Sequence, residues 1–238
     1  MNQFTKDFLF NDFPKIEYEF HPDMHDLRDS CVPAIEIPIG QLQQLHKIYR
    51  RCQQLENQFL DISTGQFFNH WYTRPRSQGW KELCVLYKQV GIRDTVNSDK
   101  IHYRRNIVTS DDMELKRLCI DLFDNVDISI EQIVILKLEP KGWINPHKDN
   151  VEIPVGLGYF WIPLHHFDPA LKVFPFGWLN HSLGNLYLFN HCQYVHAVYN
   201  NMDKNRYVMI GRLNLSKKSS VIDQNKNLSY TNWRQLWI

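Results

Sequence analysis

The spacing of apolar residues predicts two helices in the first half of the chain. The apolar positions of the first recur every three or four residues, at Leu42, Leu45, Ile48, Cys52, Leu55 and Phe59. With Gly65 just beyond its end, this pattern predicts a helix over about 40–60. A second helix is predicted over about 111–125, because Asp111 and Asp112 suit its start and the following leucines fall on one face.

After these helices the pattern changes to short apolar runs rich in β-branched and aromatic residues, which predict strands. The runs are Leu83–Tyr87, Ile133–Leu138, Tyr159–Leu164, Leu186–Phe189, Val195–Tyr199 and Tyr207–Leu215. Turn signals separate them, at Glu139-Pro140-Lys141-Gly142, Asn145-Pro146, Gly156 with Gly158, and Asn200-Asn201.

Early helices followed by many short strands predict an α+β protein with an antiparallel core. We expect this core to be a double-stranded β-helix, or jelly roll, flanked by helices that come mainly from the N-terminal half. We expect one domain over residues 1–238, which has an N-terminal arm and helix (1–64), the jelly-roll core (65–215) and a polar tail (216–238).

Composition narrows the class of protein. The chain is 43% hydrophobic and 22% charged, with a formal net charge of +1, so it can bury a full core but has no overall field to attract nucleic acid. No apolar run is long enough to span a bilayer. The five cysteines are scattered and never form a Cys-x-x-Cys pair. We therefore expect reduced thiols and a cytoplasmic protein that does not act on membranes. Modification of nucleic acid is a further alternative, to which the weak net charge gives little support.

Three side chains have the types and spacing of a metal site. In an extended segment, His147 and Asp149 point to the same side, so both can face one cavity. His196 interrupts a later apolar run and supplies a second imidazole. Two imidazoles and one carboxylate form the facial triad of non-haem iron(II) oxygenases, which leaves coordination positions open for a co-substrate and dioxygen.

Arg206 adds an anion-binding group to this triad. It lies ten residues after His196 and opens the run Arg206–Ile210. A short turn through 200–205 would return the chain antiparallel to the His196 strand and place the guanidinium inside the barrel. A charge in a buried apolar strand is energetically unfavourable unless a ligand or a partner neutralises it. The guanidinium fork pairs well with a carboxylate.

Other interpretations of these residues stay open. Each one taken alone has an ordinary structural explanation, and His191 is a rival to His196 as the third ligand. Two histidines and one aspartate also suit a zinc hydrolase, although that enzyme would not need Arg206. A non-catalytic jelly-roll protein that binds a ligand is a further alternative.

The order His147-x-Asp149, His196, Arg206 resembles that of the Fe(II)/2-oxoglutarate-dependent oxygenase superfamily. The segment Gly184–Asn190, followed by His196-Ala197-Val198-Tyr199-Asn200, resembles the aspartyl/asparaginyl β-hydroxylase branch, which includes free-proline hydroxylases. The resemblance covers about 131–215, is fainter over 65–130 and does not reach the first sixty residues. It implies a dioxygenase that uses Fe(II), O2 and 2-oxoglutarate, with the triad on the iron and Arg206 on the distal carboxylate of 2-oxoglutarate.

The chain departs from this branch at one place. The branch commonly has an Arg-x-His pair that helps to hold 2-oxoglutarate, whereas Tyr159 and Trp161 stand there in this sequence. The Tyr159 hydroxyl and the Trp161 indole N–H can still donate hydrogen bonds to a carboxylate. The expected reaction is hydroxylation of a C–H bond in an amino acid or a peptide side chain, and Arg74, Arg76, Arg104 and Arg105 are candidates to bind such a substrate.

Overall fold

The computed structural model describes nine stretches of the chain, and these hold two α-helices, a 3-10 turn and ten strands. The described residues are 34–61, 77–87, 110–124, 129–147, 157–166, 171–173, 177–179, 181–189 and 195–214. In chain order the elements are β1 (Ala34–Pro38), α2 (Leu42–Gln54), η2 (Glu56–Gln58), β2 (Leu60–Asp61), β3 (Ser77–Tyr87), α4 (Met113–Asp121), β4 (Ser129–His147), β5 (Leu157–Pro163), β6 (Leu171–Val173), β7 (Gly177–Trp178), β8 (Asn185–Phe189), β9 (His196–Tyr199) and β10 (Arg206–Asn214).

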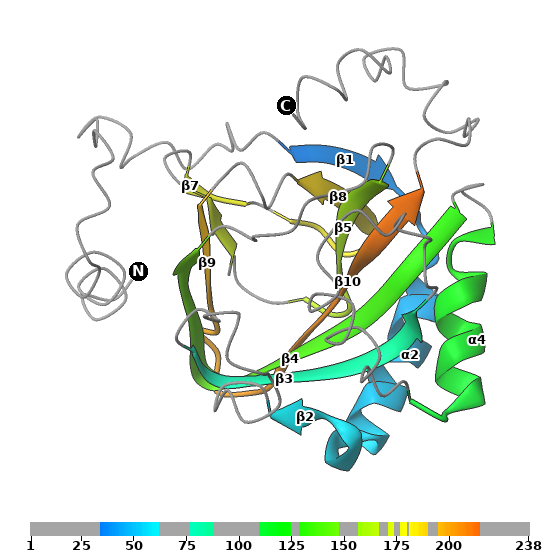
Figure 1. Cartoon of the computed structure of the whole chain (residues 1–238), viewed down its shortest axis with the longest axis horizontal. Coiled ribbons are helices and arrows are strands. Elements are labelled where there is room, and N and C mark those ends of the chain that lie inside the picture. The colour runs from blue at the N-terminus through cyan, green and yellow to red at the C-terminus, as the bar shows by residue number, and fades with distance from the viewer. Residues whose placement is uncertain are drawn as a thin grey trace, which may run out of the picture.

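The strands form one antiparallel sheet that curls back on itself (Figure 1). Its order is β1-β8-β5-β10-β4-β9-β6-β7, with β3 along the other edge of β4 and β2 beside β3. The long strand β4 joins the two halves of the sheet: residues 129–138 pair with β10, and residues 143–147 pair with β9. The predicted antiparallel core with few helices is therefore confirmed.

The predicted turn at 139–142 lies inside β4, so the expectation that it ends a strand is wrong. Lys141 has a φ of 60°, and a Cβ on Gly142 would lie 2.8 Å from the Gln78 carbonyl oxygen. Backbone hydrogen bonds from the Lys141 N–H to the Asn200 oxygen and from the Asn200 N–H to the Gly142 oxygen hold this corner against the β9–β10 connection. The turn residues bend the strand from one half of the sheet to the other instead of stopping it.

One face of the sheet packs against the helices. The buried face of α2, which includes Leu45 and Ile48, and Leu115 of α4 share a hydrophobic cluster with Ile135 of β4 and Met209 of β10. Figure 1 shows α2 and α4 together beside β3 and β4. This outer core forms because alternate residues of a strand point to one face of the sheet, and helical spacing gives each helix a matching apolar side.

The other face of the sheet encloses a second core. Leu136 and Ile144 from the two halves of β4, Trp161 of β5, Val198 of β9 and Val208 of β10 belong to this inner core. Strands from both halves of the curled sheet contribute to it, so it fills the space between them. A side chain that alternates in phase with these residues therefore points into the barrel.

The ends of both helices are fixed by long-range polar contacts. The Asp112 side chain accepts a 2.6 Å hydrogen bond from the Leu115 N–H at the start of α4 and forms a 2.5 Å ion pair with Arg51 of α2. The Gln41 side chain before α2 donates to the Leu122 carbonyl oxygen at the end of α4. Both helices are shorter than the sequence predicts, because their last turns become a 3-10 turn and irregular structure. None of the helices in the described stretches is long and apolar enough to cross a membrane.

Hydrogen bonds from the Asn200 side chain join the corner of β4 to the β9–β10 connection. Its side chain is 1% exposed, and its amide nitrogen donates to the carbonyl oxygens of Leu138, Glu139 and Lys204. Its amide oxygen accepts from the Met202 N–H. One side chain thus hydrogen-bonds to backbone groups of both β4 and the β9–β10 connection.

Replacement of Asn200 with alanine is expected to lower the free energy of unfolding by about 2–4 kcal/mol, because buried carbonyl groups lose their donors. Chemical denaturation of both proteins measures this difference. The matched control is Asn201→Ala, since Asn201 is exposed and contacts Lys141 only through its backbone oxygen. Equal stability of the two variants would contradict the role given to Asn200.

Candidate active site

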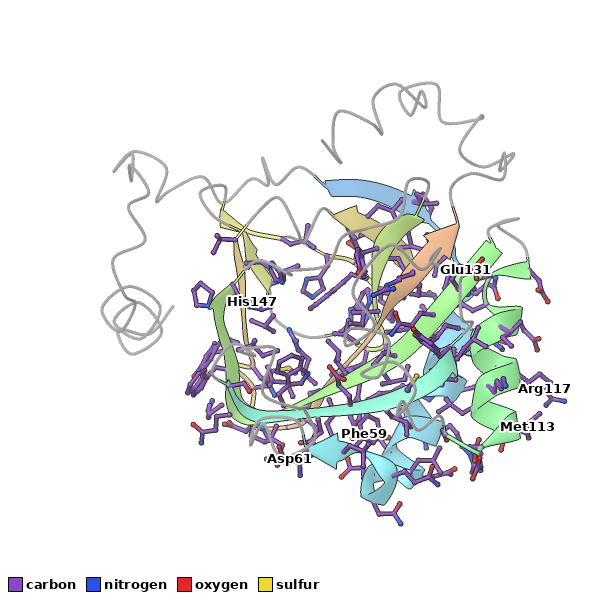
Figure 2. All side chains as sticks on the ribbon, viewed as in Figure 1. Phe59, Asp61, Met113, Arg117, Glu131 and His147 are labelled. Carbon is purple, nitrogen blue, oxygen red and sulfur yellow. The ribbon has the colours of Figure 1, made fainter. Side chains whose placement is uncertain are left out.

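His147 and His196 lie opposite each other on neighbouring strands. His147 is the last residue of β4, His196 is the first of β9, and the two are paired across the ladder. Their ring centroids are 4.3 Å apart, with 51° between the ring planes. His196 is 4% exposed, whereas His147 is only partly buried at the end of its strand (Figure 2). Since metal–imidazole bonds are about 2.0–2.1 Å long, rings at this separation can reach one ion.

The remaining ligand candidates lie outside the described residues. These are Asp149 and the rival histidine His191, and the structure tests neither. Within the described stretches, no group of three His, Cys, Asp or Glu side chains is close enough to hold a metal. The structure therefore brings two of the three predicted ligands together, and the full triad remains a prediction.

Arg206 is a cation enclosed in the barrel. It is the first residue of β10, pairs with Leu138 and is 1% exposed. Two residues further along the strand, Val208 belongs to the inner core, so Arg206 points to the same side. Its guanidinium carbon lies 5.3 Å from the ring centroid of Trp161. Burial lowers the pKa of Arg206 to about 9, which still leaves the group charged at neutral pH.

Trp161 and Tyr159 lie on the inner face of β5. Trp161 is 2% exposed, and its buried indole N–H has no hydrogen-bond partner among the described residues. Tyr159 is partly buried, and its ring lies under the guanidinium of Arg212 at 5.3 Å. A buried guanidinium next to an indole N–H is complementary to a carboxylate. These residues therefore fit 2-oxoglutarate chemically, as the two imidazoles fit Fe(II).

Behind Arg206, on the outer face, the adjacent residue Tyr207 belongs to a polar network that sequence reasoning missed. Glu56 accepts hydrogen bonds from the Tyr207 hydroxyl, from Lys137 at 3.0 Å and from Asn205 at 2.9 Å. Burial opposes ionisation of Glu56, but these donors outweigh it and hold its pKa below the ordinary value. The network fixes the start of β10 and thereby the position of Arg206.

His165 completes this network from the end of β5. Its Nδ1 contacts the His166 carbonyl oxygen at 3.0 Å, and its Nε2 accepts from the Tyr207 backbone N–H at 3.1 Å. Both contacts together require a neutral ring with the proton on Nδ1. Burial lowers the pKa of His165 to about 4, and the nearby cations Lys204 and Arg206 act in the same direction.

The depressed pKa of His165 predicts a loss of stability in acid. The folded protein keeps the ring neutral, whereas the unfolded chain binds a proton below about pH 6.5. The stabilisation is therefore complete above that pH and is lost as the pH falls toward 4, with a slope of at most about 1.4 kcal/mol per pH unit for one proton. Denaturation at several pH values should show a smaller slope in His165→Gln than in the parent protein. Parallel slopes would show that His165 titrates normally.

Comparison with known proteins gives distant structural likenesses. No protein-family model matches the sequence, and no curated protein matches it in sequence. A prolyl-4-hydroxylase from Pseudomonas putida is 12% identical, with a TM-score of 0.43 over 80% of this chain and 96% of the other. A prolyl hydroxylase from Trichoplax adhaerens, in complex with a hypoxia inducible factor peptide fragment, is 12% identical, with a TM-score of 0.47 over 77% and 84%.

A third solved structure is an oxidoreductase of the 2OG-Fe(II) oxygenase family from Burkholderia pseudomallei. It is 16% identical, with a TM-score of 0.42 over 85% of this chain and 93% of the other.

Proposed function

We propose that this chain is a non-haem Fe(II)/2-oxoglutarate-dependent oxygenase that hydroxylates a C–H bond in an amino acid or a peptide side chain. One observation carries the proposal: the paired imidazoles of His147 and His196 share a barrel with the buried guanidinium of Arg206. A metal site alone needs no enclosed cation, and an enclosed cation alone needs no paired imidazoles. Their combination suits an enzyme that holds both a metal and a carboxylate.

The strand order supports a jelly-roll core for this enzyme. The path β8-β5-β10-β4 forms one four-stranded layer and β4-β9-β6-β7 the other, with the bent strand β4 shared between them. Side chains from both layers meet in the inner core. In such a barrel, His147 and His196 belong to one layer, whereas Trp161 belongs to the other and Arg206 opens β10 within it.

Each of these residues would have a distinct role in the proposed enzyme. His147, Asp149 and His196 would hold the iron on one face, which leaves the opposite positions open. Arg206 would pair with the distal carboxylate of 2-oxoglutarate, and the Trp161 N–H and the Tyr159 hydroxyl would donate hydrogen bonds to a carboxylate of the co-substrate. When bound, iron and 2-oxoglutarate supply the oxidising chemistry, which consumes O2 and releases succinate and carbon dioxide. The apolar inner core excludes water, which strengthens the contacts to the anion.

The decisive test uses the purified chain without oxygen. Addition of Fe(II) and 2-oxoglutarate should produce a visible charge-transfer band, and admission of air should then yield succinate. Samples without iron or without 2-oxoglutarate are the controls. Absence of both the band and succinate would contradict the proposal, and tight zinc binding with hydrolase activity would favour the zinc enzyme instead.

A further inference from the structure

One carboxylate from outside the sheet contacts both chain neighbours of Arg206. Glu56 belongs to η2, and its Oε1 atom accepts hydrogen bonds from the Asn205 amide at 2.9 Å and from the Tyr207 hydroxyl. Its Oε2 atom forms a 3.0 Å ion pair with Lys137, which is paired with Tyr207 across the ladder between β4 and β10. A single side chain therefore joins the residue before Arg206, the residue after it and the strand beside it.

These contacts fix the direction in which the Arg206 side chain leaves the strand. Successive residues of a strand point to opposite faces, so contacts to residues 205 and 207 orient the peptide units on both sides of residue 206. The Arg206 side chain is thereby directed to the inner face, where its guanidinium carbon lies 5.3 Å from the Trp161 ring centroid. Because Tyr207 points to the outer face, Glu56 acts on Arg206 through the backbone of β10.

The position of Glu56 is set by the packing of the helix that precedes it. η2 follows α2, and Leu45, Ile48 and Leu55 of this segment are buried in the outer core. Figure 1 shows α2 beside β3 and β4. A group that binds a ligand has to be held within about 0.5 Å of its productive geometry. Because the helix is packed against the sheet, Glu56 is a firm attachment point for the start of β10.

We propose that Glu56 is a positioning residue for the co-substrate, which keeps Arg206 aimed at the distal carboxylate of 2-oxoglutarate. This inference rests on the proposed oxygenase function. The guanidinium fork pairs with a carboxylate through two parallel hydrogen bonds, so a small rotation of the arginine weakens one of them. The affinity for 2-oxoglutarate therefore depends on a residue of the N-terminal helical segment. The arginines that the sequence suggests as substrate ligands lie outside the described residues, and these are Arg74, Arg76, Arg104 and Arg105.

The experiment separates co-substrate affinity from stability. Anaerobic titration of the iron-loaded protein gives the half-saturating 2-oxoglutarate concentration from the charge-transfer band. Glu56→Ala should raise this concentration about tenfold, since displacement of a binding group by about 1 Å can cost about 100-fold. Its Fe(II) affinity and its succinate rate at saturating 2-oxoglutarate should stay close to those of the parent. Glu56→Gln keeps the Oε1 acceptor but loses the ion pair with Lys137, so its 2-oxoglutarate affinity should lie between the two.

A double variant distinguishes positioning of Arg206 from a general structural role. On the Arg206→Met background, Glu56→Ala should weaken 2-oxoglutarate binding no further, because Glu56 acts through Arg206. Leu118→Ala is the control for lost stability, since Leu118 is buried in the outer core on α4 and is not a partner of Glu56. It should unfold more easily than the parent and bind 2-oxoglutarate equally well. If Glu56→Ala does not fold, Tyr207→Phe, which removes one donor, takes its place with an expected rise of about threefold.

Three results would overturn the role given to Glu56. The first is a folded variant, Glu56→Ala or its replacement Tyr207→Phe, that binds 2-oxoglutarate like the parent. The second is a loss of 2-oxoglutarate affinity in Leu118→Ala as large as that in Glu56→Ala. The third is an equal effect of Glu56→Ala with and without the Arg206 side chain. A parent protein without the anaerobic band would instead refute the oxygenase function itself.

Discussion

Replacement of His196 with alanine is expected to abolish iron-dependent succinate formation. The imidazole is 4% exposed and faces His147 at a ring separation of 4.3 Å, and among the described residues no group of three His, Cys, Asp or Glu side chains could hold a metal in its absence. Loss of a residue that merely orients a metal ligand typically costs about 10- to 100-fold, and loss of a ligand itself should exceed about 100-fold. Anaerobic titration with Fe(II) and a succinate assay measure the effect.

Two further variants make this result specific. His147→Ala removes the partner ring at the more exposed end of β4, where truncation disturbs packing less, and should give a similar loss. His46→Ala is the control, because His46 is exposed on α2 and, among the described residues, it contacts the Arg50 side chain and the Tyr49 ring, both on the same helix. If His191→Ala abolishes iron binding while His196→Ala retains it, the ligand assignment is wrong.

The regular elements follow from the sequence where a local pattern is long enough. Helical spacing predicted α2 and α4, and runs of β-branched and aromatic residues predicted the larger strands, because each such element buries one consistent face. The strands β1, β2, β6 and β7 were missed. The last three are only two or three residues long, so they show no periodicity. Partners far along the chain determine β1, β2 and β6, and β7 pairs with β6.

The residues of the candidate site differ in the same way: some have a local sequence signal, and others depend on contacts that are distant in sequence. Arg206 was predicted to lie inside the barrel from the charge it places in an apolar run, and burial at 1% agrees with that expectation. Arg212 was not singled out, although its even spacing from Arg206 places it on the same face of β10. The contact between Glu56 and Tyr207 joins residues 151 positions apart, which no local pattern reveals. Asp149 remains a prediction from spacing.

Replacement of Arg206 with methionine is expected to weaken 2-oxoglutarate binding by about 10- to 100-fold. A hydrogen bond to a charged group contributes about 1.5–3 kcal/mol, and each 1.4 kcal/mol is a factor of ten. Methionine keeps the unbranched apolar stem, so the inner core should stay packed. Fe(II) binding without co-substrate should change little, because Arg206 is not a ligand. The measurement is the 2-oxoglutarate dependence of the anaerobic band, next to a metal titration.

Three variants separate the contributions of the Arg206 charge, the planar shape of its guanidinium and the Trp161 N–H donor. Arg206→Lys retains the cation but loses the planar fork, so its 2-oxoglutarate affinity should lie between those of the parent and Arg206→Met. Trp161→Phe keeps a ring beneath the guanidinium and removes only the N–H, which should cost less than loss of the arginine. 2-Oxoglutarate should raise the melting temperature of the iron-loaded parent but not of Arg206→Met. If Arg206→Met binds 2-oxoglutarate like the parent, the buried guanidinium has a structural role, and His147 and His196 would then mark a metal enzyme of another kind.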